Sequence, residues 1–234
     1  MMKPSVSLPI IGYMKSPYQE KFGIPRQPNL VQIESYIDML PPYNDLLAFA
    51  GIEAFSHLWL VWQFHDNKSQ DQTDKFRPQV RPPRLGGNKK LGVFATRSMY
   101  RPAPVGLSVV QLKEVKKVGK ALRVYVTGSD LLDGTPVLDI KPYIHYSDAI
   151  PHAQSGYAQE EPLRKEVSWT EEALIKQQVL ELSDQLIQEL NDVLSFDPRP
   201  AYQEDPERIY KMKFACLDIS FSVQAEQIII IDLI

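Results

Sequence analysis

The chain has 234 residues, of which 44% are hydrophobic and 24% are charged, and its formal net charge is −3. This composition is ordinary for a soluble globular protein and excludes a membrane-spanning segment, because no apolar run approaches the ~20 residues that a bilayer requires. The apolar start is too short for a signal peptide, so we expect a cytoplasmic protein. Its single cysteine, Cys216, excludes an internal disulfide and is expected to be an inert core thiol.

Short β-prone runs between turn signals dominate the first 150 residues. Many short strands joined by long Pro-rich loops favour an antiparallel β-barrel or sandwich. A turn at Val118-Gly119-Lys120 predicts a hairpin between two of the runs, and a local helix is possible around residues 43–49. The predicted strands cover residues 6–13, 54–64, 92–96, 107–118, 122–128 and 135–140.

The pattern changes near residue 150, and the polar residues 147–166 are expected to be a linker. A helical tract follows, with Ser168 or Thr170 as its N-cap and a possible break at Ser183-Asp184. The closing segments, joined across Ala225-Glu226, predict a terminal β-hairpin. We therefore expect a mainly β fold in two domains: a barrel over residues 1–150 and a small α+β domain over residues 165–234.

Residues 75–113 contain no Asp or Glu but nine Lys or Arg, in a chain that is acidic overall. Dense Pro and Gly indicate that much of this stretch is shaped loop rather than a merely solvated basic face. A one-sided cationic stretch of this kind favours an anionic partner. Its basic residues are Lys75, Arg77, Arg81, Arg84, Lys89, Lys90, Arg97, Arg101 and Lys113.

The common cofactor and metal patterns are missing. The sequence has no G-x-G-x-x-G after a strand, no phosphate-binding P-loop and no G-x-S-x-G elbow. With one Cys and four scattered His, a metal site is not expected.

Three further segments carry polar and aromatic groups: residues 20–29, residues 55–66 and residues 128–143. Each segment also has a purely structural interpretation. Arg26 can pair with a surface carboxylate, and the strand with Trp59 and Trp62 is expected to be core. The D-G-T-P sequence can be a hairpin turn and nothing more. Together, however, they offer carboxylates for ribose hydroxyls, aromatic rings for a base or a cation, and arginines for anionic groups.

These segments also carry a family resemblance that covers nearly the whole chain. The motifs M-K-S-P-Y, E-K-F-G-I-P-R-Q-P, G-I-E-A-F-S-H-L-W, R-P-P-R-L-G-G-N, G-V-F-A-T-R-S, D-G-T-P-V-L-D-I-K-P-Y and D-P-R-P-A-Y occur in this order. The set closely resembles the TsaA-like (TrmO) family of tRNA methyltransferases. The resemblance implies a non-Rossmann β-barrel that binds S-adenosylmethionine, and a homodimer with its cofactor site near the subunit interface.

The implied reaction is methyl transfer to N6 of N6-threonylcarbamoyladenosine, beside the anticodon of a threonine tRNA. Carried over by motif, the expected cofactor contacts are Arg26, Gln27, His65, Asp66, Arg97, Leu107, Ser129 and Asp130. Asp130 or Asp66 would suit the ribose hydroxyls.

The nucleophile is a weak, ureido-like nitrogen whose proton needs an acceptor, and the substrate's own carboxylate is one alternative. Among the protein's residues, Asp133, Asp139 and His65 are the candidates for this base. Arg101, Lys141, Tyr143 and Arg199 are expected to contact RNA, and Tyr100 is a second candidate for base stacking. One position departs from the family's R-P-N-P-I-G pattern, since Ala103 stands where an amide side chain is usual.

Two other functions remain open at this stage. The same cofactor and barrel could methylate another RNA or a small molecule. Alternatively, a non-catalytic RNA-binding barrel would grip phosphate through its basic loops, with a steep salt dependence and no response to S-adenosylmethionine. The acidic residues near Asp130 disfavour the second alternative, because a pure phosphate binder avoids carboxylates.

Overall fold

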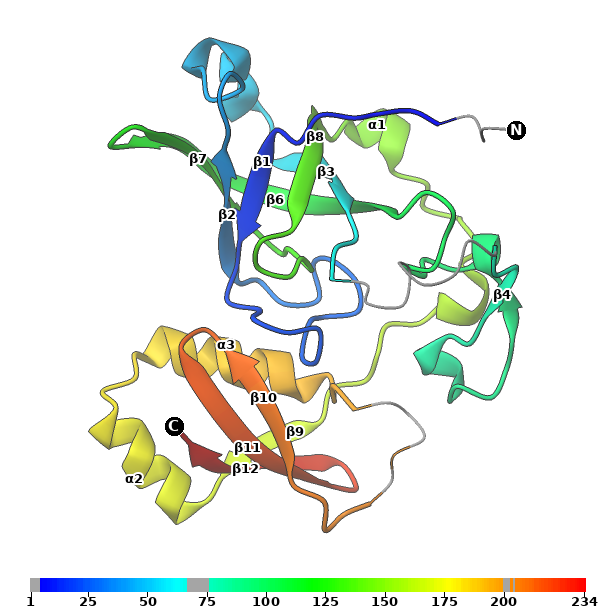
Figure 1. The fold of residues 1–234 in the computed structure, drawn as a ribbon. Coiled ribbons are helices and arrows are strands. Elements are labelled where there is room, and N and C mark those ends of the chain that lie inside the picture. Colours follow the sequence, from blue (N-terminus) through cyan, green and yellow to red (C-terminus); the bar gives the residue numbers. More distant parts are fainter. Residues whose placement is uncertain (1–4, 67–75, 200–202, 204) are drawn as a thin grey trace.

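The computed structural model describes residues 5–66, 76–199, 203 and 205–234. Lys75 of the basic stretch and residues 200–202 of the D-P-R-P-A-Y motif lie outside the described residues. Six antiparallel strands in the first part close into a barrel in the order β1-β2-β7-β6-β3-β8 (Figure 1). These strands are β1 (Gly12–Lys15), β2 (Glu34–Met39), β3 (His57–Gln63), β6 (Val105–Val118), β7 (Ala121–Thr127) and β8 (Pro136–Pro142).

The barrel closes because its strands alternate between apolar residues that face inward and polar residues that face outward. In β7, Leu122, Val124 and Val126 are fully buried, and Leu58 and Leu60 of β3 meet them in the same core. The β6–β7 hairpin turns at Gly119, whose φ of 62° is the left-handed conformation that such a turn requires.

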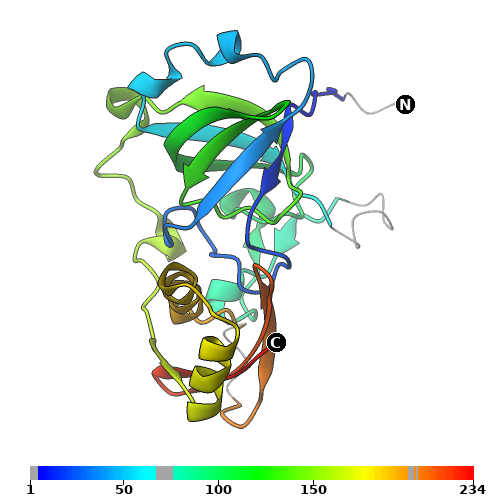
Figure 2. The same cartoon turned by 90° about the vertical axis from the view of Figure 1, so that its left-hand side faces the viewer.

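A second, smaller sheet in the C-terminal part has the strand order β10-β11-β12-β9. Its β12–β9 pair is parallel, whereas the other two pairs are antiparallel. Two helices pack on this sheet (Figure 2) and contribute buried Ala173, Leu190, Val193 and Leu194 to its core. These elements are β9 (Glu166–Trp169), α2 (Glu171–Val179), α3 (Asp184–Ser195), β10 (Tyr210–Phe214), β11 (Leu217–Gln224) and β12 (Gln227–Leu233).

Several short elements lie between the barrel strands or between the barrel and the C-terminal sheet. The basic loops form the two-stranded sheet β4 (Gln79–Val80) and β5 (Leu91–Gly92), beside the barrel in Figure 1. The remaining elements are the helix α1 (His145–Asp148) and 3-10 turns at Leu46–Phe49, Ile52–Ala54, Pro83–Leu85, Val93–Ala95 and Gly156–Ala158. In the part of the chain that the structure describes, no helix has the length and apolar character needed to cross a bilayer.

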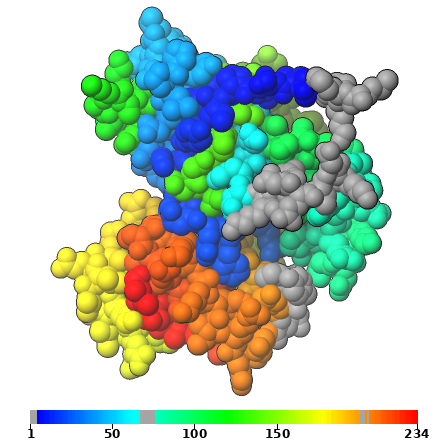
Figure 3. Space-filling model, in the orientation of Figure 1, coloured from blue at the N-terminus to red at the C-terminus, as the bar shows by residue number. Residues whose placement is uncertain are grey.

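One segment of the first part belongs to the C-terminal core. Residues 16–33, which we call the crossing segment, leave the barrel between β1 and β2 and bury Tyr18, Val31 and Ile33 against that core. In Figures 1 and 3 this blue segment lies between the barrel and the orange strands. The backbone of Ala215 donates to the carbonyl of Pro17 over 2.7 Å, so the two parts are joined by main chain as well as by side chains.

A glycine makes the close approach possible. Gly23 has a φ of 95°, and a Cβ at this position would overlap the thioether of Met212 in β10. Any L side chain at position 23 would therefore meet both an unfavourable backbone conformation and a clash.

Several expectations from the sequence are confirmed: the hairpin at Gly119, the terminal hairpin across Ala225-Glu226, and the helix break, where Ser183 caps α3. Thr170 caps α2 through a hydrogen bond from the Ala173 amide, and the other candidate, Ser168, lies in β9. The first strand begins at Gly12, later than expected.

Other expectations are wrong. The segment 92–96 is mostly a 3-10 turn, because Val93 tucks inward while Phe94 stays 72% exposed. Cys216 is exposed and not a core thiol, since it sits at the turn between β10 and β11. The sequence did not predict strands β2, β4, β9 and β10.

Phe214 tests how far the crossing segment and the small sheet depend on one core. Its ring is 1% exposed and lies 6.0 Å from the ring of Tyr18. We expect Phe214→Ala to lower the free energy of unfolding by about 3–5 kcal/mol, the usual cost of emptying a buried phenylalanine site. Urea unfolding monitored by circular dichroism measures this. Leu163→Ala, at a position that is 88% exposed, is the control, and an equal loss in both variants would contradict the expectation.

Candidate active site

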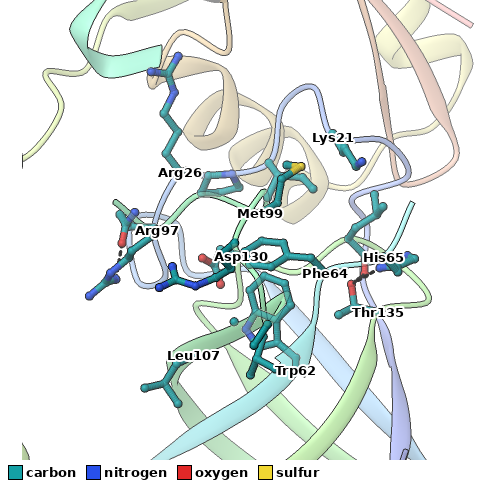
Figure 4. Close-up of a pocket in the computed structure, with 18 of the residues that line it drawn as sticks. Lys21, Arg26, Trp62, Phe64, His65, Arg97, Met99, Leu107, Asp130 and Thr135 are labelled. Carbon is teal, nitrogen blue, oxygen red and sulfur yellow. Dashed lines mark hydrogen bonds between the residues drawn. The ribbon is translucent and has the colours of Figure 1, made fainter. Parts of the chain in front are cut away.

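A pocket of about 560 Å³ opens between one end of the barrel, the crossing segment and the basic loops (Figure 4). Its volume lies within the range of small-molecule and cofactor sites. Its walls combine aromatic rings, one carboxylate and four cationic side chains. The lining residues are Lys21, Ile24, Pro25, Arg26, Gln27, Trp59, Trp62, Phe64, His65, Arg97, Met99, Arg101, Ala103, Val105, Gly106, Leu107, Asp130, Leu132 and Thr135.

The floor of the pocket is aromatic. Trp62 is 8% exposed, and Phe64 packs edge-on against it with the ring centroids 4.4 Å apart. Gly106, on the neighbouring strand, faces the Trp62 ring so closely that a Cβ there would overlap it. The absence of a side chain at Gly106 therefore leaves room for the Trp62 ring, and the parts of the two rings that line the pocket can meet a flat base or a cation.

Asp130 is the carboxylate of the pocket, and a polar chain holds it in place. The indole of Trp62 donates to the Ser108 hydroxyl over 3.0 Å, and that hydroxyl donates to Asp130 over 2.6 Å. Burial raises the pKa of Asp130 to about 6, although the Ser108 hydrogen bond, a backbone hydrogen bond and the charge of Arg97 each oppose the shift. A cationic ligand beside Asp130 would favour the charged form further.

Arginines form the opposite rim. Arg97 donates to the side-chain oxygen of Gln27, and Arg101 donates to the carbonyl of Thr96 over 3.1 Å. Arg26 turns its guanidinium away from Asp130, as Figure 4 shows, and donates to the carbonyl of Arg199 over 2.8 Å. Arg26 thus lines the pocket through its loop while its charged end is used elsewhere.

His65 lies at the other side, just after β3. The Thr135 hydroxyl donates to the Leu132 carbonyl over 2.7 Å, and it lies 3.2 Å from His65 Nδ1. The donor and acceptor in this contact depend on the tautomer of the ring, and in the tautomer that donates from Nδ1, Nε2 is the nitrogen that can accept a proton. This arrangement suits a proton acceptor at the pocket wall.

Lys21 connects the crossing segment to the end of β3. Its ammonium donates to the carbonyl of Asp66 and lies 3.6 Å from that residue's carboxylate. Asp66 itself has a φ of 57°, a conformation that Asp tolerates better than most residues.

The structure brings together only part of the set predicted from sequence. Arg26, Gln27, His65, Arg97, Arg101, Leu107 and Asp130 all line the pocket. Asp66 and Ser129 lie next to lining residues in the chain, and Ser129 is buried with its hydroxyl accepting from the Leu131 amide.

The other predicted residues lie outside the lining and are engaged locally. Asp133 accepts from the Ser16 amide and pairs with Lys15, and Asp139 pairs with Lys141 over 2.6 Å. The ring of Tyr143 lies against Trp59, their centroids 6.0 Å apart. Arg199 donates twice to Asp197.

Sequence reasoning missed several lining residues. Trp59 and Trp62 were assigned to the core, and Trp62 is indeed buried, but both also line the pocket. Lys21, Ile24 and Thr135 stand within the family motifs, so their position was a usable signal, whereas Met99 lies just after the motif G-V-F-A-T-R-S. Within the described ranges, no three His, Cys, Asp or Glu side chains are grouped closely enough to hold a metal ion.

Comparison with known proteins identifies the family of the chain. A family model described as the tRNA-methyltransferase O N-terminal domain matches residues 13–149, and the TrmO C-terminal domain model matches residues 162–234. The chain belongs to the TrmO family. Its two matched regions correspond to the barrel with the pocket and to the small sheet with its helices.

Individual relatives match over much or most of the chain. The tRNA (adenine(37)-N6)-methyltransferase of Escherichia coli is 46% identical, over 84% of this chain and 83% of the relative. A protein of Pyrococcus abyssi named as a probable S-adenosyl-L-methionine-binding protein is 38% identical, over 63% of this chain and 73% of its own length. The crystal structure of TrmO from Pseudomonas aeruginosa superposes with a TM-score of 0.78 at 34% identity, covering 99% of both chains.

The pKa of Asp130 gives a test of the pocket that needs no ligand. Since burial raises this pKa from 3.8 to about 6, burial of the charge costs nothing below pH 4, and the folded state loses stability as the pH rises from about 4 to about 6 and none further above that. We expect Asp130→Asn, which does not titrate, to exceed the parent in stability by about 2–3 kcal/mol at pH 8, with the difference vanishing near pH 4. Chemical denaturation across this pH range measures it, and a difference independent of pH would contradict the assignment.

Proposed function

We propose that this protein is an S-adenosylmethionine-dependent tRNA methyltransferase. The proposed acceptor is N6 of N6-threonylcarbamoyladenosine beside the anticodon of threonine tRNA. The observation that carries the proposal is a single pocket in which aromatic rings and the Asp130 carboxylate face a rim of arginines. Membership in the TrmO family and the name of the Escherichia coli relative support the choice of reaction.

The residues present fit the proposed cofactor. Trp62 and Phe64 offer faces for an adenine ring or a sulfonium cation, and Asp130 offers a carboxylate for a positive charge or for ribose hydroxyls. Gln27 and Arg97, held together by a hydrogen bond, would contact the polar end. When bound, S-adenosylmethionine supplies a methyl group that is already activated by its positively charged sulfur.

Because the donor is activated, most of the protein's work is alignment and proton management. The packed aromatic floor holds its rings in one orientation. Asp130 places a negative charge opposite the positive charges of the arginines. We assign to His65, which lines the pocket, the role of accepting the proton that the acceptor nitrogen loses. Asp133 and Asp139 are less suited to this role because they lie outside the lining and hold other partners.

The basic loops are the proposed RNA surface. Phe76 and Phe94 stack 6.1 Å apart and are 56% and 72% exposed, while Arg77 lies over the ring of Tyr100. Exposed rings among cations, in a stretch without a carboxylate, match single-stranded RNA, whose unpaired bases stack on aromatic faces. An anticodon loop presents its bases unpaired, so a base can enter the pocket at small cost. We further propose that the protein acts as a homodimer.

The decisive experiment is methyl transfer from labelled S-adenosylmethionine to threonine tRNA, with and without its threonylcarbamoyl group. We expect label only in the modified tRNA. Arg97→Ala should reduce the rate by about 100-fold, because Arg97 holds Gln27 and neighbours Asp130, and misplaced reactants lose most of the orientation advantage. Cofactor binding without labelling of either tRNA would point to another acceptor, and salt-sensitive RNA binding without cofactor binding would point to a non-catalytic barrel.

The aromatic pair has its own expected outcome. Phe94→Ala should raise the KM for tRNA about 5- to 100-fold, the range expected for the loss of one base–ring stack, and leave the Kd for S-adenosylmethionine unchanged. Steady-state kinetics with calorimetry measures both. Leu47→Ala, at an 82% exposed position in the 3-10 turn Leu46–Phe49, is the matched control. A change in molecular mass in solution, with no change in the KM for tRNA, would show instead that Phe94 contacts a second copy.

A further inference from the structure

The loop that carries Arg26 and Gln27 is held from the C-terminal part of the chain. Arg26 Nη2 donates to the Arg199 carbonyl over 2.8 Å. At the other end of the same loop, Arg164 donates to the carbonyl of Leu30 over 2.9 Å. The pocket wall formed by this loop therefore depends on groups that are more than 130 residues away in sequence.

The Arg199 carbonyl is itself fixed by a local ion pair. Asp197 accepts from both Nε and Nη2 of Arg199 at 2.8 Å, and from the Arg199 amide at 3.3 Å. Asp197 has a φ of 46°, a left-handed conformation that Asp tolerates. Because Asp197 and Arg199 form a bidentate ion pair across this backbone turn, the Arg199 carbonyl can change its direction very little.

The Arg199 guanidinium is not exposed for contact with an RNA. Its side chain is 11% exposed, that of Asp197 is 21% exposed, and the ring of Tyr210 lies 5.7 Å below the guanidinium. The Asp197 hydrogen bond, the largest effect, raises the pKa of Arg199 above its ordinary value. These contacts describe an internal support rather than an exposed phosphate contact.

A continuous set of contacts leads from this support to the pocket carboxylate. Gln27 follows Arg26 directly and accepts from Arg97, whose charge acts on Asp130. Moving the loop would thus disturb Gln27 and Arg97 together. We propose that Asp197 and Arg199 are positioning residues that set the Arg26 loop, and through it the Gln27–Arg97 side of the cofactor site; this inference rests on the proposed function.

The first test separates cofactor binding from tRNA binding. Asp197→Asn keeps the shape and the tolerance for positive φ but removes the charge. We expect it to raise the Kd for S-adenosylmethionine about tenfold by calorimetry, equivalent to about 1.4 kcal/mol, with the Kd for tRNA within about twofold and an unchanged salt dependence. Asp232→Asn is the matched control, because Asp232 also pairs with a cation in the C-terminal sheet, Lys176, but does not contact the loop.

A double-mutant cycle tests whether the support acts through Arg26. Arg26 is exposed, so Arg26→Gln is not expected to impair folding. If the ion pair works through the Arg26–Arg199 contact, Asp197→Asn should add little to the effect of Arg26→Gln on the Kd. Fully additive effects would overturn the proposal.

A readout without any ligand keeps this test separate from the proposed function. Amide hydrogen exchange of residues 24–30 should become faster in Asp197→Asn and stay unchanged in Asp232→Asn. If the parent protein bound no S-adenosylmethionine, the proposed function would be wrong. The exchange result would still show whether the Asp197–Arg199 pair holds the Arg26 loop. Unchanged exchange together with a weakened, less salt-dependent tRNA affinity would overturn the proposal and assign Arg199 to RNA contact.

Discussion

The burial of the crossing segment in the C-terminal core is the constraint on which the rest of the structure depends. Tyr18, Val31 and Ile33 leave the barrel and pack with Phe214 and its neighbours, so the two hydrophobic cores share a continuous stretch of chain. The pocket sits at this junction because the loop between the anchored residues faces the open end of the barrel. All of its lining residues lie between Lys21 and Thr135, but the loop that carries Arg26 is held by contacts from the C-terminal part, so the pocket's geometry depends on both parts.

The pocket's charges are arranged by the same junction. The barrel contributes Asp130, whose partner Ser108 is fixed by the buried Trp62, and the loops contribute the arginines. Burial opposes the negative charge on Asp130, whereas a cation beside it would restore that charge. The buried carboxylate is therefore unfavourable in the empty site and becomes favourable when a positively charged ligand binds. The site selects such a ligand by its charge and needs no strong contact to any one of its atoms.

Local signals in the sequence predicted the hairpins, the helix caps and the barrel-like run of strands, since turns and alternation depend on neighbouring residues. The strand Glu34–Met39 escaped because polar residues interrupt its alternation, and Cys216 was misplaced because an apolar sequence does not reveal a two-residue turn. The family motifs identified six residues that line the pocket, and Arg101, expected to contact RNA, is a seventh. They could not show that Asp139 pairs with Lys141, or that the Arg199 guanidinium faces Asp197, because side-chain direction is settled by tertiary contacts.

The strand order of the small sheet has a consequence for synthesis on the ribosome. Strand β12 is the last of the four to be translated, yet it lies between β11 and β9. The sheet cannot close until Gln227–Leu233 has left the exit tunnel, so the surface that receives Tyr18 and Ile33 is completed late. The barrel can pair its own strands well before then. A nascent chain would therefore carry a formed barrel while its crossing segment is not yet buried in the C-terminal core.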